Sequence, residues 1–244
     1  MIGILGGYMK VLLDNDFIKI SVRERSSKNV VLCFTGIGHA MGAVDVQGEE
    51  FFNISSMATT VFIIDKQRSW GNNFDFLELR ELLSPYTEGK VVFSLGNSMG
   101  GFLSILASKF FDVRSVVAFV PQFSVSPKVV PDERRWRRYV DNIKAWRYES
   151  LDGAFLDGVN YYIISAVNDV ELIQLKLFPD GDNVRKIIFY GDEFGHNVAA
   201  PLKKVGALYG VIDSCFKGEC VWTILDDLKG VMKGVDVRPV VDYS

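Results

Sequence analysis

The sequence predicts an α/β fold in which helices cover both faces of a mostly parallel central sheet. Short apolar runs typical of buried strands alternate along the chain with stretches of helical spacing. Strands that are buried on both faces have such continuous apolar runs, because helices pack on both sides of a parallel sheet. The length of 244 residues and the hydrophobic content of 48% suit one domain with a sizeable core.

Each expected element follows from its local pattern. Short apolar runs that end in polar or turn residues predict strands at 17–22, 30–34, 59–64, 91–95, 115–120, 161–167 and 187–190. Apolar residues spaced three and four positions apart predict helices at 74–83, 102–110, 170–177 and 202–216. The segment 217–244 is expected to form an amphipathic helix and a short extended tail.

One segment, 122–158, interrupts this alternation. It contains prolines and a run of basic and aromatic residues at 134–139. We expect a single domain over residues 1–244, in which this segment is a small insertion that forms a partial lid over the site.

The composition excludes several classes of function. A net charge of −3 gives no electrostatic reason to expect nucleic acid or an anionic membrane as a partner. Three cysteines without metal-ligand spacing predict free thiols, a reducing compartment and no metal site.

No stretch reaches the roughly 18 to 20 apolar residues of a membrane-spanning helix. The amino terminus lacks the basic region of a secretory signal, so a cytoplasmic location is expected, with Met1 or Met9 as the start.

The most specific motif is the stretch 96–100, Gly-Asn-Ser-Met-Gly, between an expected strand and an expected helix. In that context G-x-S-x-G is the pattern of a nucleophile elbow, a sharp turn that exposes a serine hydroxyl. Ser98 is therefore the predicted nucleophile. The backbone N–H of Met99 opens the following helix, where unpaired donors and the helix dipole suit a developing oxyanion. A second donor is expected from the glycine loop at 35–38, with Ile37 preferred and Gly38 next.

A serine hydroxyl needs a base, and the chain offers only His39 and His196. His196 follows the last expected strand, and the order serine, acid, histidine along the chain selects it. The acid is expected just past the 161–167 strand, since parallel strands present their carboxyl ends at one edge. Asp169 is preferred there, with Glu171 and Asp192 as alternatives.

In these motifs the chain resembles the α/β-hydrolase superfamily, over roughly residues 15–216. Members of that family are mainly esterases, lipases, thioesterases and peptidases. The resemblance implies a serine hydrolase that cleaves a carboxylic ester or thioester through an acyl-enzyme, without a cofactor. In one respect the chain departs from the family, because the usual His-Gly of the oxyanion loop is Thr35-Gly36 here. A backbone donor does not need that histidine, so the oxyanion site is expected to survive.

The substrate is expected to be a small molecule, and five residues are candidates for contacting it. They are Trp70, His39, Phe123, Arg134 and Arg138. The two arginines favour an anionic substrate, such as a phosphopantetheine or coenzyme A thioester or an acidic acylated saccharide. The sequence indicates no oligomeric state.

Two other functions fit parts of the sequence. The glycine loop at 36–42 follows a strand, and Asp65 ends the next strand, as in an NAD(P)-binding oxidoreductase. Its G-x-G-x-x-x-G spacing is one residue longer than the dinucleotide fingerprint. A binding protein that keeps the fold without catalysis is the third option.

Overall fold

A nine-stranded sheet forms the centre of the computed structural model, which describes residues 8–38, 46–191, 194–232 and 235–239. The strands are β1 (Met9–Asp14), β2 (Ile18–Arg23), β3 (Asn29–Phe34), β4 (Thr59–Asp65), β5 (Val91–Asn97), β6 (Val113–Phe119), β7 (Asn160–Ala166), β8 (Val184–Tyr190) and β9 (Asp236–Pro239). Their order is β1-β2-β4-β3-β5-β6-β7-β8-β9. The strands from β4 to β8 in this order are parallel, whereas β1, β2 and β9 pair antiparallel at the two edges.

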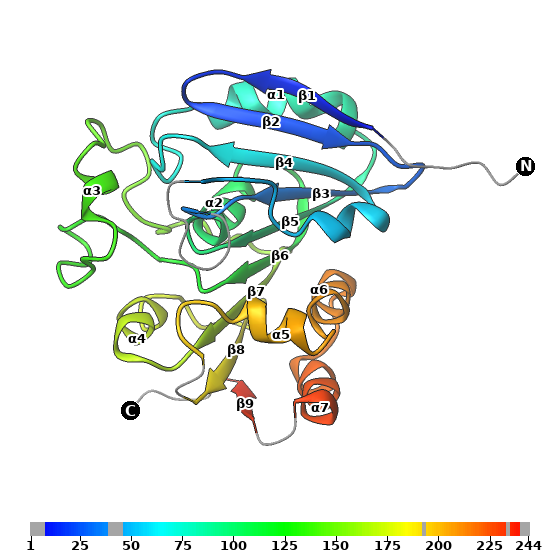
Figure 1. The fold of residues 1–244 in the computed structure, drawn as a ribbon, viewed down its shortest axis with the longest axis vertical. Helices are drawn as coiled ribbons and strands as arrows, with labels where there is room; N and C mark the ends of the chain where they lie inside the picture. Colours follow the sequence, from blue (N-terminus) through cyan, green and yellow to red (C-terminus); the bar gives the residue numbers. More distant parts are fainter. Residues whose placement is uncertain (1–7, 39–45, 192–193, 233–234, 240–244) are drawn as a thin grey trace, which may run out of the picture.

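Helices cover both faces of this sheet, which twists from β1 at one edge to β9 at the other (Figure 1). They are η1 (Phe52–Ser56), α1 (Phe76–Thr87), α2 (Met99–Ala107), α3 (Arg137–Val140), α4 (Asp169–Leu175), α5 (Ala199–Lys204), α6 (Leu208–Lys217) and α7 (Val221–Val231). Residues of α1, α2 and α4 share one buried cluster, and residues of η1, α5, α6 and α7 share another. The predicted α/β class with a mostly parallel sheet is therefore confirmed.

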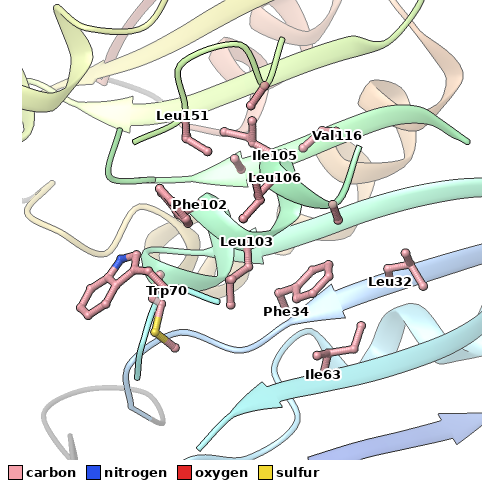
Figure 2. Packing of buried hydrophobic residues seen from close by; sticks show 14 of the residues in the cluster. Leu32, Phe34, Ile63, Trp70, Phe102, Leu103, Ile105, Leu106, Val116 and Leu151 are labelled. Carbon is pink, nitrogen blue, oxygen red and sulfur yellow. The ribbon is translucent and has the colours of Figure 1, made fainter. Parts of the chain in front are cut away.

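The central strands supply both clusters because successive side chains point to opposite faces. In β3, Leu32 and Phe34 belong to the cluster on the α2 side, whereas Val31 and Cys33 belong to the other. Figure 2 shows the α2 side, where Phe102, Leu103, Ile105 and Leu106 lie among β3, β4 and β6 residues. The α2 helix is buried throughout, which holds its first turn firmly against the carboxyl ends of the strands.

The structure differs from the expected elements at the edges. Strand β1 was not expected, because this edge strand is only partly buried and its apolar run extends only from Val11 to Leu13. Strand β9, within the expected tail, pairs with β8. The helix expected at 202–216 is two helices, α5 and α6, which Gly206 separates with a φ of 77°.

The 122–158 segment leaves the carboxyl end of β6 and contains only one short helix, α3. Figure 1 shows α3 and its flanking loops beyond the carboxyl ends of the central strands. No helix in the described part of the chain is long and apolar enough to cross a membrane.

Candidate active site

Ser98 occupies the turn between β5 and α2 in a strained backbone conformation, with φ 57° and ψ −118°. Glycines allow this turn to form. A Cβ on Gly96 would lie 2.0 Å from the carbonyl oxygen of Gly100, and one on Gly100 would lie 2.1 Å from that of Phe34. The strand, sharp turn and helix expected around Ser98 are therefore present, and the two glycines let α2 pack closely on β3 and β5.

The side chains of Ser98, His196 and Glu171 form a hydrogen-bonded chain. Oγ of Ser98 lies 2.7 Å from Nε2 of His196, and Nδ1 of the same ring lies 2.7 Å from Oε1 of Glu171. Ser98 is 4% exposed, and the Glu171 side chain is 1% exposed. The His196 side chain remains 27% exposed, so the imidazole joins a buried carboxylate to a site that solvent can reach.

Glu171, and not Asp169, is the carboxylate at His196, so the preferred assignment of the acid is wrong. Asn168 caps α4 by accepting hydrogen bonds from the backbone N–H groups of Val170 and Glu171. Asp169 is therefore the first helical residue, and it is exposed. Two positions further along an α-helix the side chain points to the opposite side, which turns Glu171 toward His196. The other alternative, Asp192, lies outside the described residues.

Four neighbouring strands deliver the polar side chains around Ser98 from their carboxyl ends. Ser98 follows β5, Glu171 follows β7 and His196 follows β8. Gln122, which follows β6 between them, was not predicted as a site residue. It is fully buried, and its Nε2 donates to Oγ of Ser98 over 3.0 Å. Its position just after a central strand was the sequence feature that could have identified Gln122 as a site residue.

Trp70 lies behind Gln122 and does not line a cleft as expected. Its side chain is fully buried, and its indole Nε1 donates to Oε1 of Gln122 over 3.2 Å. An indole nitrogen can only donate, so this contact directs the amide nitrogen of Gln122 toward Ser98. Phe123, also expected to contact substrate, is buried against Phe178 with ring centroids 5.5 Å apart.

The loop expected to supply the second oxyanion donor is held from several sides. Nε2 of Gln47 donates to the carbonyl of Gly36, and Nε of Arg68 donates to the carbonyl of Ile37. In a trans peptide the carbonyl and the following N–H point in opposite directions, so the N–H of Ile37 points away from Gln47. The oxyanion roles of Met99, Ile37 and Gly38 remain predictions. His39 lies outside the described residues.

Glu50 contacts the same loop, and sequence reasoning missed it. Its Oε2 accepts the backbone N–H of Gly36 over 3.2 Å. Burial raises the pKa of the Glu50 carboxyl to about 7, although that hydrogen bond acts in the opposite direction. A carboxyl with a pKa above its ordinary value binds protons more strongly in the folded state than in the unfolded state.

We expect the pH dependence of stability to reveal Glu50. Between the ordinary pKa of 4.5 and about 7, the wild type loses stability as pH rises, and the loss is complete above about 7. Glu50→Gln removes this penalty. In urea unfolding, the unfolding free energy of the variant relative to that of the wild type should therefore increase by up to about 3 kcal/mol between pH 5 and pH 8.

The neighbouring Glu49 serves as a control, because its pKa shifts in the opposite direction from that of Glu50. Burial acts to raise its pKa, but hydrogen bonds from its own backbone, Lys19 and Ser21 lower it overall. The unfolding free energy of Glu49→Gln relative to that of the wild type should thus not increase between pH 5 and pH 8. An unfolding free energy of Glu50→Gln that differs from the wild type equally at both pH values would contradict the assignment.

The basic run on the 122–158 segment contributes a different arginine from the two expected. Arg134 is exposed and precedes α3, and the Arg138 guanidinium lies 4.6 Å from the Tyr139 ring centroid. Arg135, between them, reaches the site. Its Nη1 donates to Oε1 of Glu171 and lies 3.0 Å from Nδ1 of His196. Because α3 begins at Arg137, Arg134 and Arg138 do not share a helical face.

Asp65 does not have the free carboxylate that binding a ribose would need. It is fully buried and accepts the backbone N–H groups of Gln67, Ser69 and Gly71 and the hydroxyl of Ser69. Part of the glycine loop that an NAD(P)-binding oxidoreductase would need lies outside the described residues. Across the residues the structure describes, no three His, Cys, Asp or Glu side chains gather as metal ligands.

Comparisons with solved structures identify similar folds. The capsule O-acetyltransferase of Neisseria meningitidis serogroup A, in complex with caged gadolinium, superposes with a TM-score of 0.60. It is 12% identical, over 84% of this chain and 92% of its own. The acylaminoacyl peptidase of Pyrococcus horikoshii has a TM-score of 0.54 at 12% identity, over 90% of this chain and 44% of its own. No protein-family model matches the sequence, and no curated protein matches it significantly.

Proposed function

We propose that this protein is a serine hydrolase that cleaves a carboxylic ester or thioester. The proposal starts from the α/β-hydrolase fold that the chain shares with these acyl-transferring and peptide-hydrolysing enzymes. The single observation that carries this proposal is the hydrogen-bonded chain of Ser98, His196 and Glu171. A buried carboxylate, an imidazole and a hydroxyl in this order are the groups of an activated serine nucleophile.

The proposed reaction begins when Ser98 Oγ attacks the acyl carbonyl carbon and its proton passes to Nε2 of His196. Glu171 accepts the Nδ1–H of the ring, which fixes the tautomer and stabilises the imidazolium. The N–H groups of Met99 and Ile37 are proposed to bind the oxyanion. Nε2 then protonates the departing alcohol or thiol, which leaves an ester on Ser98.

Deacylation uses the same groups in reverse. Water gives a proton to Nε2 and attacks the ester, and Ser98 regains its hydrogen as the carboxylic acid leaves. The amide of Gln122, held by Trp70, donates to Oγ in the resting site. It therefore restricts the hydroxyl to the direction in which His196 can take its proton.

A second outcome of the same acyl-enzyme is transfer to a hydroxyl acceptor instead of water. The similarity in fold and length to the capsule O-acetyltransferase supports this alternative. The exposed Arg134 and the Arg138–Tyr139 pair beyond the strand ends support an anionic group on one of the two substrates.

An ester and thioester panel, assayed with and without a polyol acceptor, tests the proposal. Wild type should hydrolyse short p-nitrophenyl esters, and Ser98→Ala should lose nearly all turnover while retaining its melting temperature. Acceptor-dependent consumption of the donor would assign the transferase alternative. Equal turnover by wild type and Ser98→Ala would refute both.

A further inference from the structure

Arg135 and His196 share one oxygen of Glu171. A carboxylate oxygen has two lone pairs, so Oε1 can accept one hydrogen bond from Arg135 Nη1 and one from His196 Nδ1. The two nitrogens lie 3.0 Å apart because both approach this acceptor. The guanidinium therefore fixes the direction from which the imidazole meets the carboxylate.

The other edge of the same guanidinium is anchored on Glu133, which is 4% exposed. Nε of Arg135 donates to Oε1 of Glu133 over 2.9 Å, and Nη2 donates to Oε2. Burial acts to raise the pKa of Glu133, but the Arg135 guanidinium lowers it overall. Arg135 thus lies between two buried carboxylates and compensates their charge.

Helix α4 holds both ends of this arrangement. Gln174 lies three residues after Glu171, which places the two side chains on one face of the helix. Its Nε2 donates to Oε2 of Glu133 over 3.1 Å, and its Oε1 accepts the backbone N–H of Phe123 over 2.8 Å. The start of the 122–158 segment is consequently tied to the helix that carries the proposed acid.

We propose that Arg135 is a positioning residue that makes the Ser98–His196–Glu171 chain depend on the docked 122–158 segment. This inference rests on the proposed function. With Arg135 in place, Glu171 has a fixed rotamer and the Nδ1–H of His196 has one acceptor. Without it, a buried carboxylate keeps the imidazole as its only ionic partner among the described residues, and the ring is held less firmly over Ser98.

The test compares three variants of the full chain. Arg135→Gln removes the guanidinium. Glu133→Gln/Arg135→Ala removes it without leaving Glu133 as an uncompensated buried charge, which guards against loss of the fold. Arg137→Gln, an exposed arginine two positions away, is the matched control.

Three readouts separate a positioning role of Arg135 from general damage to the fold. We expect the Arg135 variants to react with a fluorophosphonate, and to turn over ester, about 10- to 100-fold more slowly, mainly in kcat and with little change in KM. Millimolar guanidinium chloride should partly restore the Glu133→Gln/Arg135→Ala variant, whereas sodium chloride should not. The chain has only two histidines, so the Nδ1–H proton of His196 can be followed by NMR, and its signal should shift or broaden.

Wild-type rates and an unchanged His196 signal in both Arg135 variants would overturn the inference. Failure of the proposed function has a different signature, since wild type itself would then resist the fluorophosphonate. In that case the imidazole signal still decides whether Arg135 orients His196.

Discussion

Glu171→Gln should lose about 10³- to 10⁴-fold in kcat, with little change in KM. The neutral amide no longer stabilises the imidazolium that forms when Ser98 gives up its proton. It also removes the carboxylate that His196 Nδ1 and Arg135 share. Steady-state ester hydrolysis measures the effect, and thermal unfolding shows whether the variant keeps its fold.

Asp169→Asn is the matched control, because it makes the same chemical change two residues away in the same helix. Asp169 is exposed at the start of α4, so its turnover should stay within about threefold of wild type. The reverse pattern, with activity lost in Asp169→Asn and kept in Glu171→Gln, would show that the acid is Asp169, as the sequence favoured.

Gly96→Ala should destabilise the protein by about 3 kcal/mol or more and abolish activity. The new methyl group would lie 2.0 Å from the carbonyl oxygen of Gly100, which is backbone and cannot rotate away. Either α2 moves off β5 or the turn at Ser98 opens. For a chain of this length, the melting temperature should fall by about 6 to 12 °C or more.

The control for this change is Gly210→Ala, in the first turn of α6. A Cβ at Gly210 meets nothing within 4 Å, and alanine is the better helix former. That variant should be as stable as wild type or up to about 1 kcal/mol more stable. If Gly96→Ala unfolded at the wild-type temperature, the close packing of the elbow would be refuted.

The sequence predicted Ser98 and His196 as site residues because their signals are local. The serine lies in a spaced glycine motif, and the histidine is one of two in the chain. The choice between Asp169 and Glu171 instead depends on where α4 begins, and a boundary error of one or two residues reverses which carboxylate faces inward. Asn168, a good capping residue, was the sign that favoured Glu171.

Gln122 and Arg135 could not be placed in the same way. Both belong to the 122–158 segment, which is held by turns and side-chain hydrogen bonds and lacks the periodicity of a strand or long helix. Which of its arginines turns inward depends on tertiary contacts with α4. The central strands were predictable because buried parallel strands have long continuous apolar runs, whereas the edge strands β1 and β9 are partly exposed and have short apolar runs or none.

Covalent labelling of Ser98 is the sharpest test of the proposed acyl-transfer site. Intact wild-type protein treated with a fluorophosphonate should gain one adduct, which peptide mass spectrometry should locate on Ser98. Ser98→Ala should gain none, and His196→Ala and Glu171→Gln should react far more slowly than wild type. A wild-type protein that stays unlabelled, or an adduct that persists in Ser98→Ala, would contradict the proposal that Ser98, His196 and Glu171 form an acyl-transfer site.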